Sequence, residues 1–308
     1  MRYNFNVVKR VELQVADEHN KMRLEDFLLD HFISLSKMYL RELVKNADCE
    51  VNGRHENRGY KLRPNDFVEI TVDHARGTAM QPEDIDLDIV FEDDDLIIVN
   101  KPVGMLVHPS HKENSGTLLN AVVYHLNREL LTPGRKDAEA KRGVFVRPGL
   151  IHRLDKQTSG LVLLAKNARS HRILCSHFMK KRVEKRYLAL VDGIVEDDEG
   201  TIEAPIGRFA DLKMWSVKED GKHSESRYKV RERYADTTLL ELEPVTGRTN
   251  QLRIHCEMIG HPIVGDVQRG GTDLKRLCLH AFSLAFPHPS SREMVRFEVP
   301  IDFRRPSS

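Results

Sequence analysis

The chain has 308 residues, more than one ordinary hydrophobic core organises, so two domains are expected. Its hydrophobic share of 40% and charged share of 31% are typical of a water-soluble globular protein. No run of about 18 apolar residues occurs, which excludes a membrane-spanning helix. Charges interrupt residues 1–20 where a signal peptide has an apolar stretch, so no export signal is predicted.

The four cysteines are widely scattered and form no C-x-x-C pair. This spacing argues against a zinc knuckle and against a disulfide framework. We therefore expect no bound metal and a reducing, cytoplasmic location.

The charges balance, because 48 basic residues face 47 acidic ones for a net charge of +1. A nucleic-acid surface must then come from segregation of charge rather than from excess. Residues 83–95 are acidic, whereas residues 180–186 are rich in lysine and arginine. Such basic clusters are more often solvated faces than binding sites, so the segment alone decides little.

The N-terminal part predicts a small helix–helix–strands module. Apolar residues recur at helical spacing within residues 22–47, with Ser36 as the N-cap of the second helix. Asn52 and Gly53 form a hairpin signal between extended segments, and residues 64–66 mark a turn before a strand at residues 67–72. We therefore expect a domain at residues 1–75, a linker at 76–85 and a larger domain at 86–308.

The larger domain begins with residues 96–108, which predict a buried strand, a Lys-Pro-x-Gly turn and a second strand. Residues 117–130 predict a helix, and residues 131–146 a polar basic loop. A strand at 161–165 and an amphipathic helix at 168–181 follow. From residue 185 onward, short β-prone runs broken by Gly, Asp and Pro favour a mixed, largely antiparallel α+β domain.

A first candidate site lies in the segment IHRLDKQTSGLVLLAKN. His152, Arg153 and Asp155 crowd a turn that bends into an apolar strand, and a tight turn of this kind holds polar groups in fixed orientation. The alternative is a plain turn, in which the aspartate caps backbone amides and the arginine is solvated. The local pattern favours neither.

A second candidate site combines the turn residues Thr246 and Gly247 with the polar segment that follows them. An extended conformation from Thr249 to His255 would place Thr249, Gln251, Arg253 and His255 on one face and apolar residues on the other. A polar front on an apolar back fits the wall of a site. An ordinary half-exposed strand explains the same pattern.

Five blocks in this order resemble the motifs of the RluA family of pseudouridine synthases, over most of residues 20–303. They are DDDLIIVNKPVGMLVHP, HRLDKQTSGLVLLAKN, KRYLALVDG, GRTNQLRIH and RLCLHAFSLAFPHP. Residues 22–72 resemble the small RNA-binding module first seen in ribosomal protein S-four. The resemblance implies an α+β fold, with an S-four-like domain before a mixed, largely antiparallel catalytic domain.

The same resemblance implies that Asp155 is the essential aspartate, Tyr187 the active-site tyrosine and Arg253 the arginine that pairs with the aspartate. Arg153 resembles the family residue that fills the space left by a flipped base. The chain departs from the family pattern at Asn250, where His is usual, and in GDVQRGG (265–271), which lacks the usual Tyr-Gly.

These residue types suit isomerisation of uridine to pseudouridine. Cleaving the bond between ribose and uracil builds positive charge on the sugar, which a carboxylate stabilises or traps. Whether Asp155 attacks the sugar or takes a proton from it stays open. Arg253 would keep the carboxylate ionised in a closed pocket, and Tyr187 would stack on the base. No atom enters or leaves, so we expect no cofactor.

The expected partner is RNA, with large-subunit ribosomal RNA favoured over transfer RNA, and no membrane; a monomer is the default. The rival interpretations are a non-catalytic RNA-binding protein and a base-releasing glycosidase. An everted uridine and the phosphates beside it need base-binding and cationic residues. The candidates for these contacts are His152, Arg153, Lys181, Arg182, Lys185, Arg41 and Asn52.

Overall fold

The computed structural model describes residues 8–32, 35, 37–73, 81–110, 113–131, 148–212 and 214–303. They fall into two compact units, one within Met1–Asp86 and Pro109–Arg147 and the other within Leu87–His108 and Pro148–Ser308. This division differs from the expected domain limits in grouping residues 109–147 with the N-terminal ones. The expected cap Ser36, most of the linker and nearly all of the loop at 131–146 lie outside the described residues.

The first unit contains the predicted helix–helix–strands module. Helices α1 (Leu24–His31) and α2 (Lys37–Lys45) pack with an antiparallel sheet in the order β1-β3-β2. Its strands are β1 (Val8–Gln14), β3 (Phe67–Asp73) and β2 (Cys49–Val51). Both helices and β3 confirm the sequence prediction, whereas β1 was not predicted.

The helical spacing of the apolar residues explains this small core. Leu24, Phe27 and Leu28 face inward from α1 and are fully buried, and the apolar residues of α2 are buried with them. The predicted turn at Asn52 and Gly53 is present, and both residues have positive φ angles, as a tight hairpin turn requires. The same unit contains the predicted helix α3 (Leu118–Leu131).

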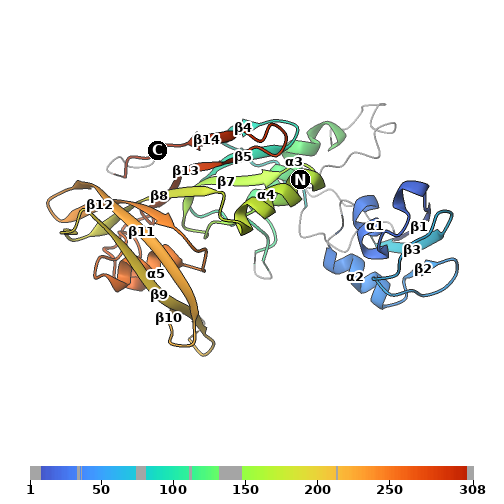
Figure 1. The fold of residues 1–308 in the computed structure, drawn as a ribbon, viewed down its shortest axis with the longest axis horizontal. Coiled ribbons are helices and arrows are strands. Elements are labelled where there is room, and N and C mark those ends of the chain that lie inside the picture. Colours follow the sequence, from blue (N-terminus) through green and yellow to red (C-terminus); the bar gives the residue numbers. More distant parts are fainter. Residues whose placement is uncertain are drawn as a thin grey trace. The chain divides into compact units, whose positions relative to one another are not determined.

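The second unit is built on one large sheet, drawn from teal to red in Figure 1. Its strands follow the order β10-β9-β11-β12-β8-β13-β7-β5-β4, with β14 beside β13 and β6 beside β7. Every pair is antiparallel except β13 with β7. The mixed, largely antiparallel α+β fold is thus confirmed. The strands are β4 (Ile89–Glu92), β5 (Leu96–Lys101), β6 (Gly149–Leu150), β7 (Ser159–Ala165), β8 (Glu184–Asp192), β9 (Glu199–Phe209), β10 (Met214–Val217), β11 (Lys222–Arg233), β12 (Thr237–Pro244), β13 (Leu279–Pro287) and β14 (Met294–Glu298).

Two apolar cores support this sheet. One joins β5, β7 and β13 to helix α4 (Ala168–Met179), and the other joins β8, β12 and β13 to helix α5 (Gln251–Met258). Strand β7 is buried along its whole length, as expected for a continuous apolar run. The turn that carries Asp155 directly precedes this strand, so rigid packing begins a few residues from the aspartate.

Gly160 allows β7 and β13 to approach closely. Its φ angle is +114°, and a Cβ atom at this position would lie 2.3 Å from the carbonyl oxygen of Ala281. Only glycine fits such a contact, so the Thr-Ser-Gly sequence after Asp155 is needed for the parallel pairing of the two strands.

Two sequence predictions about local structure are wrong. Residues 105–108 form no strand, and the Met105 carbonyl instead accepts a hydrogen bond from the Lys101 ammonium. The segment 249–255 is not extended, because helix α5 begins at Gln251. Asn250 takes a left-handed conformation with φ 56° and turns the chain into the helix, which alternation of polar and apolar residues does not reveal.

Within the described residues, no helix combines the length and the apolar character that crossing a membrane requires.

Candidate active site

A cleft of about 580 Å³ lies in the second unit, within the size range of small-ligand sites. The turn before β7, the strands β8 and β10 and the loop leading into α5 form most of its wall, and residues of α4, α5, β12 and β13 complete it. Six of the residues assigned to catalysis or base binding in the sequence line it together: His152, Arg153, Asp155, Lys185, Tyr187 and Arg253. The two candidate segments of the sequence are therefore walls of one site.

Asp155 lies in a hydrogen-bonded turn at the entrance to β7. Its backbone carbonyl accepts a hydrogen bond from the Thr158 amide at 3.1 Å. Its carboxylate makes no hydrogen bond or ion pair with any residue that the structure describes. The turn does not use this carboxylate as a cap, so the plain-turn alternative does not account for it.

Burial raises the pKa of Asp155 above the ordinary value for aspartate. The positive charges of Arg253, Arg153, Lys101 and Arg269 oppose this rise, in that order of strength. Desolvation prevails, because none of the four cations is bonded to the carboxylate. Asp155 thus has the environment of a reactive carboxylate, half-buried and without a partner inside the described chain.

Lys101 stabilises the turn that carries Asp155. It is fully buried at the end of β5, and its ammonium donates to the carbonyls of Pro102, Met105 and Lys156 at 2.8, 2.9 and 3.3 Å. Because Lys156 follows the aspartate directly, these bonds fix the backbone that carries Asp155. Burial lowers the pKa of Lys101 to about 8, and the charge of Asp155 acts in the opposite direction.

Arg253 does not make the expected fork onto Asp155. Its Nε and one terminal nitrogen donate to the two oxygens of Asp266, each at 2.7 Å, and its other terminal nitrogen donates to the Asn250 side chain at 3.2 Å. The prediction was wrong on this contact, because α5 is a helix that aims Arg253 at the turn after it. Arg253 acts on Asp155 through its charge, without a bond.

Gln251 fixes the loop that precedes α5. Its side-chain oxygen accepts from the Thr246 hydroxyl and the Arg248 amide, and its nitrogen donates to the Glu225 carbonyl and the Ser226 hydroxyl. All polar groups of this buried amide are engaged. The loop on the far side of the cleft from Asp155 is therefore rigidly attached to strand β11.

Tyr187 lies on β8, opposite Leu242 of β12 and Ala281 of β13. Burial raises the pKa of its phenol well above the ordinary value, and the nearby charge of Asp155 adds to the rise. The phenol is therefore neutral at physiological pH. Its hydroxyl makes no hydrogen bond with the described residues, so it is free to meet a ligand in the cleft.

His152 is held inside the protein. Its Nε2 accepts a hydrogen bond from the Leu163 amide at 3.1 Å, and its ring stacks on Phe178 with 5.2 Å between centroids. Burial lowers the pKa of His152 to about 3, with a smaller effect from the charge of Lys185. The imidazole is neutral, and the hydrogen bond occupies its Nε2.

The basic residues 180–186 do not form one surface. Lys185 lines the cleft with its ammonium 5.9 Å from the centre of the Phe178 ring, and burial lowers its pKa. Arg186 is paired with Glu241 at 2.7 Å. Lys181 and Arg182 lie in the exposed turn after α4, away from the cleft lining. Arg153 is exposed at the cleft and has no partner among the described residues.

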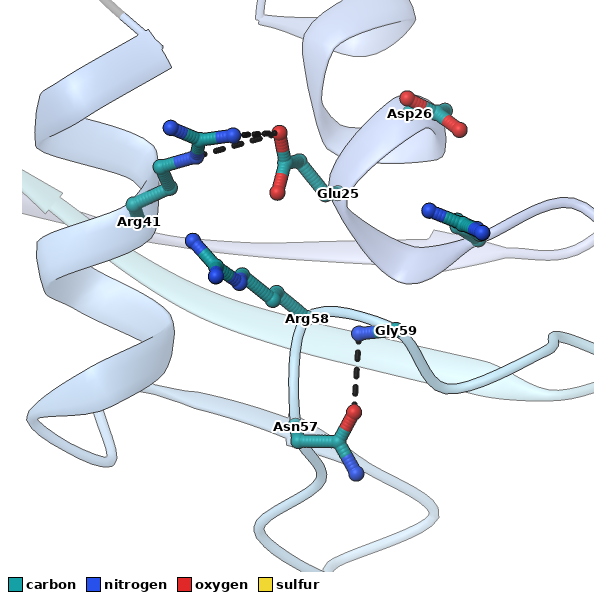
Figure 2. A pocket seen from close by; sticks show the side chains of 7 residues that line it. Glu25, Asp26, Arg41, Asn57, Arg58 and Gly59 are labelled. Carbon is teal, nitrogen blue, oxygen red and sulfur yellow. Dashed lines mark hydrogen bonds and ion pairs between the residues drawn. The ribbon is translucent and has the colours of Figure 1, made fainter.

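Arg41 and Asn52 lie in the first unit. Arg41 donates from Nε and a terminal nitrogen to one oxygen of Glu25, at 3.1 and 2.8 Å, and lies at a pocket that Arg23 and Arg58 also line (Figure 2). The Asn52 side chain donates to Asp66 and accepts from the Phe67 amide, each at 2.8 Å. Asn52 thus stabilises its hairpin, whereas Arg41 keeps donors free for a ligand.

Three residues of this site were missed or discounted in the sequence. Lys101 could have been noticed as a lysine that ends an apolar strand, where an unpaired charge is costly. Asp266 carries no local signal, because its partner is thirteen positions away on α5. Trp215 stands alone in the sequence, without a motif around it, and it also lines the cleft. No group of three or more His, Cys, Asp or Glu side chains within the described ranges is arranged to hold a metal ion.

Comparisons with known proteins point to one family. A family model described as RNA pseudouridylate synthase matches residues 95–258. An uncharacterized RNA pseudouridine synthase of Bacillus subtilis is 37% identical over 298 residues, covering 96% of this chain and 95% of that protein. The ribosomal large subunit pseudouridine synthase D of Xanthomonas campestris is 32% identical over 304 residues, covering 93% and 88%. The solved structure of human RNA pseudouridylate synthase domain containing 1 has a TM-score of 0.56 at 29% identity, covering 73% and 85%.

Proposed function

Because the chain belongs to the RNA pseudouridylate synthase family, we propose that it isomerises uridines of large-subunit ribosomal RNA and that Asp155 carries the reaction. The assignment of the reaction to Asp155 rests on the surroundings of its carboxylate. It faces a cleft without a bonding partner in the described chain, among four cations that act on it only at a distance. A carboxylate in this state is available to a substrate.

The reaction breaks the bond between ribose and uracil nitrogen one, turns the base and rejoins it through carbon five. Asp155 would either attack the sugar carbon or take a proton from the ribose. Both routes need the ionised carboxylate, so the charges of Arg253, Arg153, Lys101 and Arg269 support the reaction by opposing the rise of its pKa. Lys101 would keep the aspartate in place through the Lys156 carbonyl.

Tyr187 would stack on the uracil and place its hydroxyl near carbon five, which must lose a proton. Its raised pKa keeps the phenol neutral, so the hydroxyl would take up this proton only as it gives its own to solvent water, which is where released tritium appears. A single carboxylate with one tyrosine then suffices, because the departing base itself returns and no water has to be activated.

The target uridine has to leave its stack to enter the cleft. We assign its support to Arg153 and Lys185, which line the cleft, and phosphate contacts to Lys181, Arg182 and Arg41. His152 and Asn52 would contribute indirectly, through the strand and the turn that their side chains hold. An affinity for RNA that did not fall with added salt would count against the phosphate contacts.

Large-subunit ribosomal RNA is the favoured substrate because three relatives, at 32%, 32% and 33% identity, are named ribosomal large subunit pseudouridine synthase D. The S-four-like module in the first unit supports the same assignment, since it resembles a ribosomal RNA-binding domain. With this substrate we expect the enzyme to act in the cytoplasm.

A tritium-release assay tests the proposal. RNA labelled with tritium at carbon five of uridine is incubated with the wild-type enzyme, using large-subunit ribosomal RNA and transfer RNA as separate substrates. Tritium release from the ribosomal RNA is the expected result. Tritium release from transfer RNA alone would contradict ribosomal RNA as the substrate. Free uracil would indicate a glycosidase. The absence of both products with either RNA would indicate a binding protein.

A further inference from the structure

Trp215, the only tryptophan of the sequence, lies on the edge strand β10 and lines the same cleft as Asp155. The side chain is half-buried. Its indole N–H donates to no residue in the described ranges, and its ring meets no other aromatic ring or cation there. A fully buried tryptophan usually finds a partner for its N–H, whereas Trp215 lies at the wall of the cleft. This one presents an aromatic surface and an unused donor at the cleft.

A buried arginine fixes the backbone at this position. Arg269 is 5% exposed and donates to the Trp215 carbonyl at 2.7 Å, and its Nε lies 4.0 Å from an oxygen of Asp266. An edge strand pairs on one side only, so β10 would otherwise be held by β9 alone. Trp215 is thereby tied to the Asp266–Arg253 pair and kept at a defined place in the cleft wall.

A cation accompanies the tryptophan. Arg208 on β9 is the residue directly opposite Trp215 in the antiparallel pair, so the two side chains leave the same face of the sheet. Arg208 is exposed and has no hydrogen-bond or ion-pair partner in the part of the chain that the structure describes. An aromatic ring beside a free guanidinium is the combination that binds a nucleotide, with the base on the ring and the phosphate on the cation.

The strand order separates Trp215 from the catalytic tyrosine. Between β10 and β8, which carries Tyr187, lie the strands β9, β11 and β12. Four strand spacings amount to about 19 Å along the sheet. The two rings therefore stand on strands four places apart in the cleft wall, which allows each to serve a different base.

We propose that Trp215 is the stacking platform of a second nucleobase subsite, which binds an unpaired base near the target uridine while Arg208 binds its phosphate. The subsite rests on the proposed function, since it assumes that RNA occupies the cleft. It would help select uridines whose neighbours are unpaired, because a base inside a duplex cannot reach the ring.

Tryptophan fluorescence tests the subsite in the wild-type protein, because all tryptophan emission comes from Trp215. A single-stranded RNA oligonucleotide of mixed sequence is titrated, with inorganic polyphosphate as an anion without bases. The expected result is quenching by the RNA and none by the polyphosphate. RNA that binds without quenching, or polyphosphate that quenches equally, would overturn the proposal.

Substitutions then separate stacking from structure. Trp215→Ala is expected to raise the KM for RNA by about 5- to 160-fold, the measured range for loss of one stacked base, with kcat little changed. Trp215→Phe should recover most of the affinity because it restores a ring. Leu212→Ala is the matched control, since Leu212 is an exposed apolar residue that precedes β10 and does not line the cleft. A Trp215→Ala enzyme with wild-type KM and an intact thermal transition would refute the subsite.

The two proposals can fail separately. Quenching by RNA without tritium release from any RNA would leave the subsite standing and overturn the proposed reaction. Tritium release together with unquenched fluorescence and a wild-type KM for Trp215→Ala would do the reverse.

Discussion

Two aspartates in the second unit have opposite surroundings. Asp266, in the turn after α5, is 3% exposed and accepts two hydrogen bonds from Arg253. Asp155, in the turn before β7, has four cations around it and is bonded to none of them. The Asp266 carboxylate is bonded within the fold, whereas the Asp155 carboxylate is left available to a ligand.

The contrast distinguishes a carboxylate that is bonded within the fold from one that lines the cleft without a bond to any described residue. Sequence alone pairs Arg253 with Asp155 and offers no sign of Asp266. In the structure Asp266 orients the guanidinium, and the guanidinium influences Asp155 through space. A carboxylate with a raised pKa destabilises the fold when it is ionised, and carboxylates of this kind cluster at functional sites.

The largest effect is expected for Asp155→Asn. The amide neither attacks the sugar nor takes a proton, so turnover should fall by about 10⁴-fold or more, the scale seen when other enzymes lose a reacting group. Single-turnover tritium release measures this loss, and RNA binding in a filter assay should remain. Turnover within tenfold of the wild type would show that Asp155 is not the reacting group.

Tyr187→Phe ranks second. Removing the hydroxyl while keeping the ring should lower kcat by about 10²–10⁴-fold, the range for a lost proton-transfer group, and leave KM near the wild-type value. Steady-state kinetics on labelled RNA separate the two constants. If kcat were unchanged, the hydroxyl would have no part in proton transfer.

Asp266→Asn should act on folding first. It leaves the guanidinium of Arg253 without its charged partner, and removing one member of a buried pair typically costs about 3–5 kcal/mol. Urea unfolding gives the free-energy change. Asp220→Asn is the matched control, because the ion pair of Asp220 with Lys218 is exposed and such pairs contribute little. Equal free energies of unfolding for Asp266→Asn and Asp220→Asn would show that Asp266 has no structural role.

The smallest predicted effect is a shift in pH dependence. Activity needs ionised Asp155, so kcat/KM should fall as pH drops through a pKa that lies above the ordinary aspartate value. Arg153→Gln removes one charge that opposes the rise, so the acid limb should move to higher pH. Arg153→Lys should leave it near its wild-type position. If the acid limb of kcat/KM lay at the same pH in Arg153→Gln as in the wild type, the charge of Arg153 would have no influence on the pKa of Asp155.

Local patterns predicted the parts of the fold that depend on nearby residues. The apolar spacing in α1, α2, α3 and α4 matched helices, and the Asn52-Gly53 turn formed as expected. The family motifs predicted that Asp155, Tyr187 and Arg253 share a site, and the three residues line one cleft. These features follow from spacing within a few residues or from a long ordered match.

Structural features that depend on residues far apart in the sequence could not be predicted from local patterns. Alternation in residues 249–255 suited a strand as well as a helix, and the decision came from the left-handed Asn250 and the bonds of Gln251 to β11. Strand β1 depends on pairing with β3, about sixty residues away in the sequence. The fork of Arg253 onto Asp266 required the helix first, so a wrong secondary structure led to a wrong ion pair.

The most direct test of the central claim is the melting temperature of Asp155→Asn against the wild type across pH. Because the folded-state pKa of Asp155 is raised, ionising it destabilises the fold, and this cost grows as pH rises through the ordinary and then the raised pKa. The variant should therefore melt above the wild type at neutral pH, and the difference should disappear in acid. A variant that melts below the wild type at neutral pH would mean that Asp155 is a bonded structural carboxylate, as Asp266 is.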